Sequence, residues 1–170
     1  MRRGIFFVVI LFVCAFSGLA QQRDVKQLKV AGKCAKKAEK AFYKKDYQKS
    51  ITLYGEAIAA NPWKDEYYLK KGQSYQYFRD DSAAINTYTY AIEKLPSTTL
   101  CYLERGRLRY RIADYRGAYS DYSAHSNIHG ETLELLGYKK AVLFELEEYK
   151  TAIPVLNQAI KLDPNSSSVL

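Results

Sequence analysis

The chain has 170 residues, of which 48% are hydrophobic and 26% are charged. This length suits one domain of ordinary size, and the hydrophobic fraction supplies a core, which excludes a wholly disordered chain. The formal net charge of +8 is explained most simply by a solvated basic face, with an acidic partner or a membrane surface as alternatives. Tyrosine is unusually frequent, at 16 residues. Because its ring packs while its hydroxyl stays near water, this favours a thin fold with many half-buried positions.

The first twenty residues have the pattern of a secretory signal. Two arginines precede an uninterrupted apolar stretch over residues 5–16, and small residues lead up to Ala20. We predict cleavage after Ala20 and export to the periplasm or the extracellular space, with or without outer-membrane association. The alternatives are an uncleaved anchor, for which the stretch is short, and a lipoprotein signal at Cys14, whose preceding residues match poorly. No other stretch is long and apolar enough for a span, so we predict no stable membrane span after cleavage.

The rest of the sequence repeats with a period of about 34 residues, which is typical of stacked helical units. Like residues recur at this period in four columns: Tyr54, Tyr88 and Tyr122; Ala57, Ala91 and, two periods on, Ala159; Gly72 and Gly106; and Pro62, Pro96 and, two periods on, Pro164. The chain is therefore predicted to consist of a signal peptide (1–20), a lead-in (21–30), four repeat units (31–64, 65–98, 99–132 and 133–166) and a tail (167–170).

Each unit is predicted to contain two helices. In the second unit, residues 66–78 and residues 83–95 both carry apolar side chains at helical spacing. A polar break with helix-capping residues, 79–82, separates them, and Pro96 ends the second helix. Small residues such as Gly72 allow the two helices to approach, and tyrosine rings fill the space between them. One such pair cannot bury its apolar faces alone, whereas stacked pairs can.

The repeating unit resembles the tetratricopeptide repeat, whose pattern runs aromatic, apolar-glycine, tyrosine, alanine, aromatic, alanine and proline. The second unit supplies this pattern as Tyr68, Lys71-Gly72, Tyr75, Ala84, Tyr88, Ala91 and Pro96. The resemblance covers residues 31–166. It implies an all-α, right-handed α-solenoid of four stacked helix–turn–helix units.

Several positions depart from the pattern: Cys34 and Ala38 in the first unit, His125 and Gly130 in the third, and Lys140 in the glycine column of the fourth. Pro154 is expected to bend the last helix, because it removes a backbone bond to Lys150. The residues after Pro164 are too few for a capping helix. We therefore expect tyrosine-rich packing, a homodimer or a partner to cover the last apolar face.

The sequence contains no combination of acid, base and nucleophile, and no phosphate-binding loop or CxxC pair. We therefore predict a non-enzymatic protein without a cofactor. His125 and His129 lie one helical turn apart and are weak candidates for a metal site, with Asp121 as a third ligand. The simpler interpretation places His129 at a helix end, where it interacts with exposed carbonyls.

Three further features have simple explanations. The carboxylate pairs 80–81 and 147–148 are predicted to be first-turn charges that favour the helix dipole. Cys34 and Cys101 lie two units apart, roughly 20 Å at the ~10 Å spacing of packed helices, so we expect core thiols without a disulfide. Asn165 begins a glycosylation acceptor triplet, which matters only in a eukaryotic source.

The resemblance implies that the first helices of successive units line a concave groove. On these helices, the face opposite the packing stripe includes Tyr43, Gln73, Tyr77, Arg107, Tyr110, Arg111 and Phe144. Aromatic anchors combined with Arg and Gln suit peptide binding, although each residue alone could simply face solvent. We predict an extracytoplasmic scaffold or adaptor that binds a protein or peptide segment. Nucleic acid is not expected as a partner, because export separates the protein from most nucleic acid. The alternatives are an envelope-anchored assembly component and a metal-binding protein using His125 and His129.

One role within the resembling family is rejected from the sequence. Its co-chaperones hold a chaperone's terminal carboxylates with a clamp of Lys, Asn and Arg. The corresponding positions here are Ala35, Glu39, Lys70, Leu100 and Glu104. Because two of these residues are acidic, they would repel a carboxylate.

Overall fold

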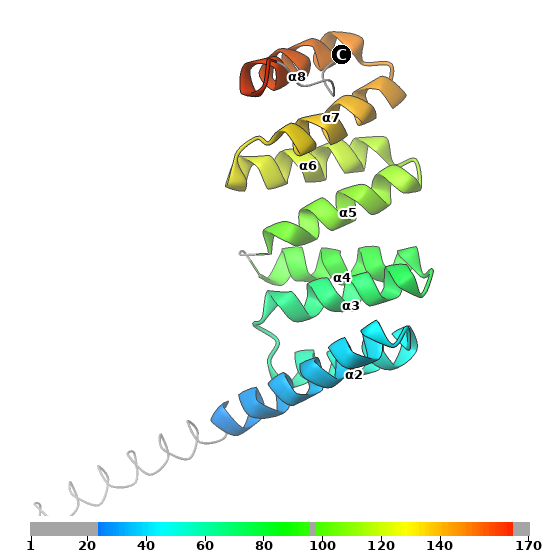
Figure 1. The fold of residues 1–170 in the computed structure, drawn as a ribbon, viewed down its shortest axis with the longest axis vertical. Helices are drawn as coiled ribbons and strands as arrows, with labels where there is room; N and C mark the ends of the chain where they lie inside the picture. The colour runs from blue at the N-terminus through cyan, green and yellow to red at the C-terminus, as the bar shows by residue number, and fades with distance from the viewer. Residues whose placement is uncertain (1–23, 96–97, 165–170) are drawn as a thin grey trace, which may run out of the picture. The chain divides into compact units, whose positions relative to one another are not determined.

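The computed structural model describes residues 24–95 and 98–164. The predicted signal peptide and its cleavage site, Pro96, Asn165 and the tail at 167–170 lie outside the described residues. Within the described ranges all regular secondary structure is helical, which confirms the predicted all-α class (Figure 1). None of the helices in these ranges has the length and apolarity that crossing a bilayer requires.

The chain divides into two compact units, residues 1–67 and 68–170. The first contains helical residues 24–43 and α2 (Tyr47–Ala60), and α3 (Asp65–Tyr77) begins in it and continues into the second. The second unit continues with α4 (Asp81–Lys94), α5 (Thr99–Arg111), α6 (Tyr115–His129), α7 (Leu133–Glu145) and α8 (Tyr149–Leu162).

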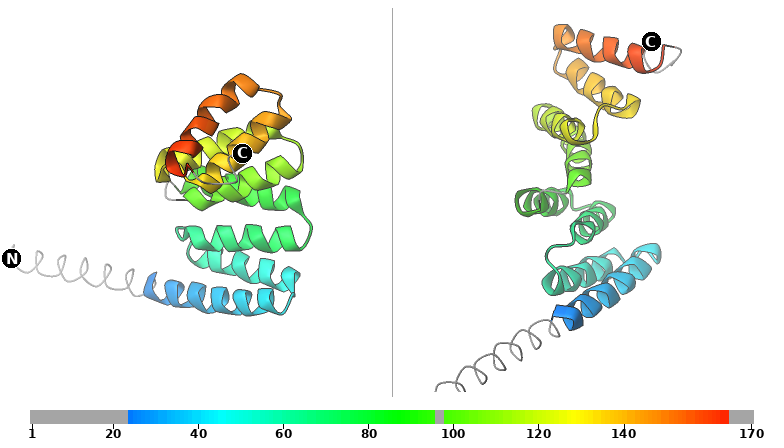
Figure 2. Two further views of the ribbon diagram at one scale, coloured as in Figure 1. Left: turned by 45° about the horizontal axis from the view of Figure 1, so that its top comes forward. Right: turned by 90° about the vertical axis from the view of Figure 1, so that its left-hand side faces the viewer.

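The helix starts keep the repeat period of the sequence. Helices α3, α5 and α7 begin one period apart, and so do α2, α4, α6 and α8. In the second unit each helix from α4 to α8 packs against the next one along the chain. Figure 2 shows these consecutive helices running in alternating directions. Residues one period apart therefore occupy equivalent places on alternate helices.

The turn that joins the two helices of a pair has the same backbone geometry each time. Its central residue has a positive φ of 56–69° at each of Lys45, Arg79, Ala113 and Glu147. The next backbone N–H bonds back to a carbonyl five residues earlier, as Asp114 does to Arg109 at 2.8 Å. This is the hydrogen bond of a Schellman motif, which ends a helix through one left-handed residue.

The residue after the left-handed position also begins the next helix. The side chains of Asp46, Asp80 and Asp114 each accept a hydrogen bond from the backbone N–H three residues on. The predicted capping role of the 79–82 segment is therefore confirmed at Asp80. The interpretation of Glu147 as a first-turn charge is wrong, because Glu147 lies in the turn itself. Glu148 is the N-cap of α8 but makes no side-chain cap bond.

We expect Ala113→Gly to stabilise the protein. A left-handed conformation costs a residue with a Cβ about 1–2 kcal/mol, and glycine avoids most of that cost. The free energy of unfolding, measured with urea, should rise by about 1 kcal/mol. The control is Ala59→Gly at an exposed position inside α2, which should lower it by about 1 kcal/mol. A loss of stability at position 113 would contradict the turn geometry.

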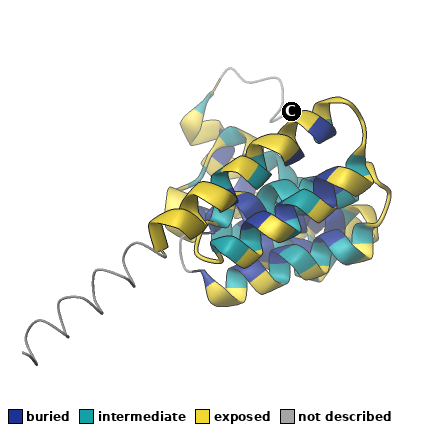
Figure 3. Ribbon diagram, turned by 90° about the horizontal axis from the view of Figure 1, so that it is seen from below, coloured by how far each residue is buried: buried dark blue, intermediate teal, exposed yellow. Residues whose placement is uncertain are grey.

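The core is built from the alanine and tyrosine columns. Tyr54, Tyr88 and Tyr122 are at most 4% exposed, and burial raises the pKa of each hydroxyl. Figure 3 shows buried residues on the faces that the helices turn toward their neighbours within each unit and exposed residues on the outer faces. The tyrosines of this column are thus more deeply buried than composition alone suggests.

Helix α8 continues through Pro154 to Leu162.

Candidate functional site

Helices α5 and α7 carry a group of charged and aromatic side chains that contact one another. We call Glu104, Arg107 and Tyr110 of α5, with Glu134, Tyr138 and Glu145 of α7, the α5–α7 surface. Both helices are first helices of their predicted units, as the groove hypothesis requires. Because α5 and α7 occupy equivalent places in successive repeats, side chains that are far apart in the sequence meet on this surface.

Arg107 lies at the centre of the α5–α7 surface. Its guanidinium donates to Glu104 Oε1 at 2.9 Å, to Glu134 Oε1 at 2.8 Å and to the Tyr138 hydroxyl at 2.8 Å. The guanidinium carbon also lies 5.1 Å from the centroid of the Tyr138 ring, within range of a cation–π interaction. Arg107 is thus held in one orientation while its side chain stays 37% exposed.

The electrostatics of this group follow from its hydrogen bonds. The hydroxyl of Tyr138 donates to Glu134 Oε1 at 2.6 Å. This bond is the main cause that lowers the pKa of Glu134, and the charge of Arg107 lowers it further. The same bond raises the pKa of Tyr138. The lowered pKa favours the ionised form of Glu134 beside Arg107.

Tyr110 extends the same surface toward the ends of α5 and α7. Its hydroxyl donates to Glu145 Oε1 at 3.4 Å, and its ring lies 5.5 Å from that of Tyr115. Burial, followed by the Glu145 charge, raises the pKa of Tyr110. Tyr110 and Arg107 are thus two predicted groove residues that the structure places on one surface.

Arg111 forms an ion pair with the preceding helix. Its guanidinium bonds Asp81 through two nitrogens, one of them Nε at 3.1 Å. Asp81 begins α4, the second helix of the preceding predicted unit. Arg111 therefore ties the end of α5 to the start of α4 and does not join the α5–α7 surface.

The remaining predicted groove residues are dispersed. Tyr77 is 59% exposed at the end of α3, and Gln73 is half-buried on the same helix. Phe144 is 51% exposed and packs edge-on against Tyr149 at 5.6 Å. Tyr43 is 75% exposed and belongs to the other compact unit, at the end of helical residues 24–43. None of the contacts given above joins Gln73 or Phe144 to Arg107.

The two histidines both interact with the first residue of α5. His125 Nδ1 lies 3.0 Å from the Thr99 carbonyl oxygen, and His129 Nε2 is hydrogen-bonded to the Thr99 hydroxyl. Within the described residues, no group of three or more His, Cys, Asp and Glu side chains is placed to hold a metal ion. The proposed third ligand, Asp121, is occupied by Arg105 and Arg109. The histidines therefore join α6 to α5, and His129 contacts a hydroxyl where a carbonyl was expected.

A buried ionic cluster that the sequence did not predict joins α4, α5 and α6. The Arg105 guanidinium donates to the two carboxylate oxygens of Asp121 at 2.9 and 2.7 Å and to the Thr89 hydroxyl at 2.9 Å. Arg109 adds a bond of 3.0 Å to Asp121, whose side chain is 2% exposed. Because Thr89, the two arginines and Asp121 come from α4, α5 and α6, this cluster holds these three helices in position.

A signal for this cluster was present in the repeat. Arg105 lies one repeat period after Lys71 and one before Lys139, at the position where the repeat pattern calls for an apolar residue. Lys139 is likewise buried, and it bonds Ser126 Oγ at 2.7 Å and Glu131 Oε1 at 2.6 Å. A basic column at an apolar position indicates buried charge that needs partners.

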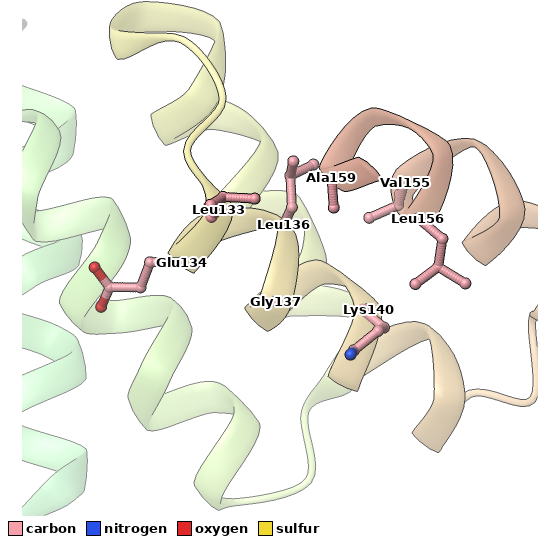
Figure 4. A pocket seen from close by; sticks show the side chains of 8 residues that line it. All are labelled: Leu133, Glu134, Leu136, Gly137, Lys140, Val155, Leu156 and Ala159. Atoms are coloured by element: carbon pink, nitrogen blue, oxygen red, sulfur yellow. The ribbon is translucent and has the colours of Figure 1, made fainter. Parts of the chain in front are cut away.

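A small apolar cavity lies between α7 and α8 in the last predicted unit (Figure 4). Its volume is about 190 Å³, and Leu133, Leu136, Val155, Leu156 and Ala159 form most of its lining. Small-molecule sites usually enclose about 300–1,000 Å³. The cavity therefore matches the size of a side chain better than that of a cofactor. The two cysteines in the described ranges, Cys34 and Cys101, form no disulfide, as expected.

No protein-family model matches the sequence, and no curated protein matches it. Solved structures do match. The first TPR domain of Spaghetti (RPAP3), bound to an HSP90 peptide, superimposes with a TM-score of 0.65 at 19% identity, over 71% of this chain and 95% of that one. The Sgt2 TPR domain from Aspergillus fumigatus superimposes with a TM-score of 0.61 at 21% identity, over 71% of this chain and 82% of that one.

A tetratricopeptide repeat protein from Parabacteroides merdae gives the higher TM-score of 0.75, at 15% identity, over 83% of this chain and 56% of that one. The agreement extends to proteins of different origin, while the identities remain low. What these structures share with the present chain is therefore its backbone architecture. The chain has the all-α helical-repeat solenoid fold of tetratricopeptide repeat proteins.

Proposed function

We propose that this chain is a non-enzymatic scaffold or adaptor that binds a segment of another protein, and that it acts outside the cytoplasm. The α5–α7 surface carries the proposal. Its tyrosine rings and its arginine are partly exposed and are already held in place by hydrogen bonds, so binding orders few side chains. Tyr and Arg are also the residue types that contribute most at protein interfaces.

The charge of this surface indicates the chemistry of the segment. Glu104, Glu134 and Glu145 surround Arg107 and Tyr110, so the surface carries more negative than positive charge. An acidic peptide would be repelled, whereas a neutral or basic segment with an apolar side chain would be favoured. A structural neighbour with this fold binds an HSP90 peptide with the sequence SRMEEVD. We carry over from it only the capacity of the fold to bind peptides.

Site-specific photocrosslinking in the native source tests the proposal. A photoreactive residue at position 110 should give an adduct with a partner protein, and one at Ser120, an exposed position on α6, should not. With the captured partner, Arg107→Gln should weaken binding about 5–30-fold, as expected for an interface hot spot. Arg116→Gln removes the same charge from a side chain that is 82% exposed on α6 and should leave the affinity unchanged.

Two outcomes would contradict this proposal. Adducts from position 120 alone would move the binding site to another face, and adducts from neither position would remove the support for a scaffold. The extracytoplasmic setting rests on residues 1–20, and the captured chain should begin at Gln21. An intact Met1 would favour the envelope-anchored alternative. A homodimer through the C-terminal end stays a prediction.

A further inference from the structure

One face of the first helix is a row of lysines. Helical residues 24–43 carry Lys26, Lys29, Lys33, Lys36, Lys37 and Lys40, and all six are exposed. At 3.6 residues per turn they fall within about 100° of arc and extend over about 21 Å of helix. We call this row the lysine stripe. In the described part of the chain, no acidic side chain lies within 4.0 Å of any of these ammonium groups.

Most of the net positive charge of the protein lies on the helix that carries the lysine stripe and on the turn that follows it. Residues 24–45 contain eight lysines and two acidic residues, a net charge of +6. Residues 68–164 contain 13 basic and 12 acidic residues, a net charge of +1. The chain is therefore not uniformly basic. Its excess charge is concentrated on one helix and the turn after it.

The opposite face of the helix fixes the orientation of the stripe. Ala31 and Ala38 are fully buried and belong to a core cluster with Tyr54 and Ala57 of α2. In Figure 3, exposed residues mark the helix that follows the grey N-terminal trace. Packing on one side and lysines on the other leave the charged face free to meet an extended surface.

Apolar side chains flank the stripe. By helical position, Val25 and Tyr43 lie along one edge and Val30 along the other, and they are 47%, 75% and 45% exposed. A row of lysines bordered by aliphatic and aromatic side chains suits an anionic bilayer surface, where ammonium groups contact headgroups and apolar side chains enter the interface. Tyrosine in particular is enriched at that depth.

Other acidic partners fit less well. Residues 24–67 contain no arginine, so the face lacks the forked donors that bind individual phosphates or carboxylates in two-bond geometry. Only one aromatic residue flanks the stripe, whereas single-stranded nucleic acid is usually bound by several stacked rings. A plane of charged headgroups requires neither feature. We infer that the lysine stripe binds the surface of membranes that contain anionic phospholipid.

Vesicle flotation of the full chain tests this inference. One set of vesicles is phosphatidylcholine alone, and in the other about a third of the lipid is phosphatidylglycerol, both at about 0.1 M salt. Because apolar residues 5–16 contribute to both vesicle types, the readout is the ratio of the two partition coefficients. The stripe variant carries Lys26→Gln, Lys33→Gln, Lys37→Gln and Lys40→Gln. Its ratio should be lower than that of the wild type by at least about tenfold.

A charge-matched control separates the stripe from net charge. It changes four exposed lysines outside the stripe: Lys49, Lys94, Lys150 and Lys161, each to Gln. The control should keep the wild-type ratio, and circular dichroism should show equal helix content in both variants. A wild-type ratio near one would overturn the inference, and so would an equal loss in both variants.

A third result would assign the stripe to another class of partner. If the wild type shows no preference for anionic vesicles but binds polyglutamate or single-stranded RNA through these lysines, then the inference is wrong and an acidic macromolecule is the partner. Because the measurement involves no protein partner, its outcome is independent of the α5–α7 surface. Failure of one proposal therefore leaves the other standing.

Discussion

Replacing Asp121 by alanine is expected to lower the free energy of unfolding by about 3–5 kcal/mol, which for many domains of this size is a large part of the total. Asp121 is 2% exposed and accepts hydrogen bonds from Arg105 and Arg109. Without the carboxylate, the buried guanidinium of Arg105 keeps its charge but loses its counterion. Most of the cost comes from this uncompensated charge and not from the loss of the pair itself.

Urea unfolding followed by circular dichroism measures this effect. The control is Arg116→Ala, which breaks a surface ion pair with Glu148 whose side chains are 82% and 36% exposed. That change should cost no more than about 1 kcal/mol. Equal losses in the two variants would show that the Arg105–Asp121 pair is effectively solvated.

A double substitution, Arg105→Met with Asp121→Leu, separates charge from packing. It replaces the pair by apolar side chains of similar size, and such replacements are often neutral or stabilising. We therefore expect the double variant to recover most of the stability that Asp121→Ala loses. If it is as unstable as the single variant, the ionic geometry itself holds α5 to α6.

The periodicity of the sequence was sufficient to predict the helical framework. Tyr88 and Ala91 belong to columns that recur with the repeat period, and both are fully buried where the columns place them. The end of α4 at Lys94, with Leu95 as its C-cap, was also predictable, because proline follows Leu95 directly. These features depend on local rules that each unit repeats.

The candidate site was only partly predictable, because its contacts join different units. The spacing of Arg107 placed it on an outer face but could not show that Glu134 and Tyr138 hold it there. Arg111, four residues later, is directed toward Asp81 by its position at the helix end. Which partner a long side chain selects depends on the positions of neighbouring helices. A period alone does not encode those positions.

Lys71 illustrates a different limit. The repeat pattern has an apolar residue at this position, but the residue here is a lysine. In the structure it is half-buried, burial lowers its pKa, and its ammonium lies 5.9 Å from the Tyr75 ring centroid. Counting this position as a match therefore hides the fact that a charged side chain stands where the pattern has an apolar one. At Gly72, the next residue, the chain keeps the residue of the pattern, and the reason is steric.

The expected result of Gly72→Ala is a loss of about 1–3 kcal/mol, even though alanine is the better helix former. A Cβ at position 72 would fall within contact distance of ring atoms Cε1 and Cζ of Tyr88 and 2.9 Å from Cδ1. Tyr88 is fully buried, and its hydroxyl accepts a bond of 3.1 Å from Gln76. The ring therefore cannot move aside without disturbing the contact between α3 and α4.

Gly137→Ala is the matched test, because the same change is made inside α7. There the new Cβ would meet nothing within 4 Å, so the helix propensity of alanine should raise stability by up to about 1 kcal/mol. The two substitutions should thus shift the urea midpoint in opposite directions. If both stabilise the protein, Tyr88 yields easily and the tight packing of α3 on α4 is not what requires glycine. Opposite signs would show that glycine at position 72 is there for the space that Tyr88 occupies.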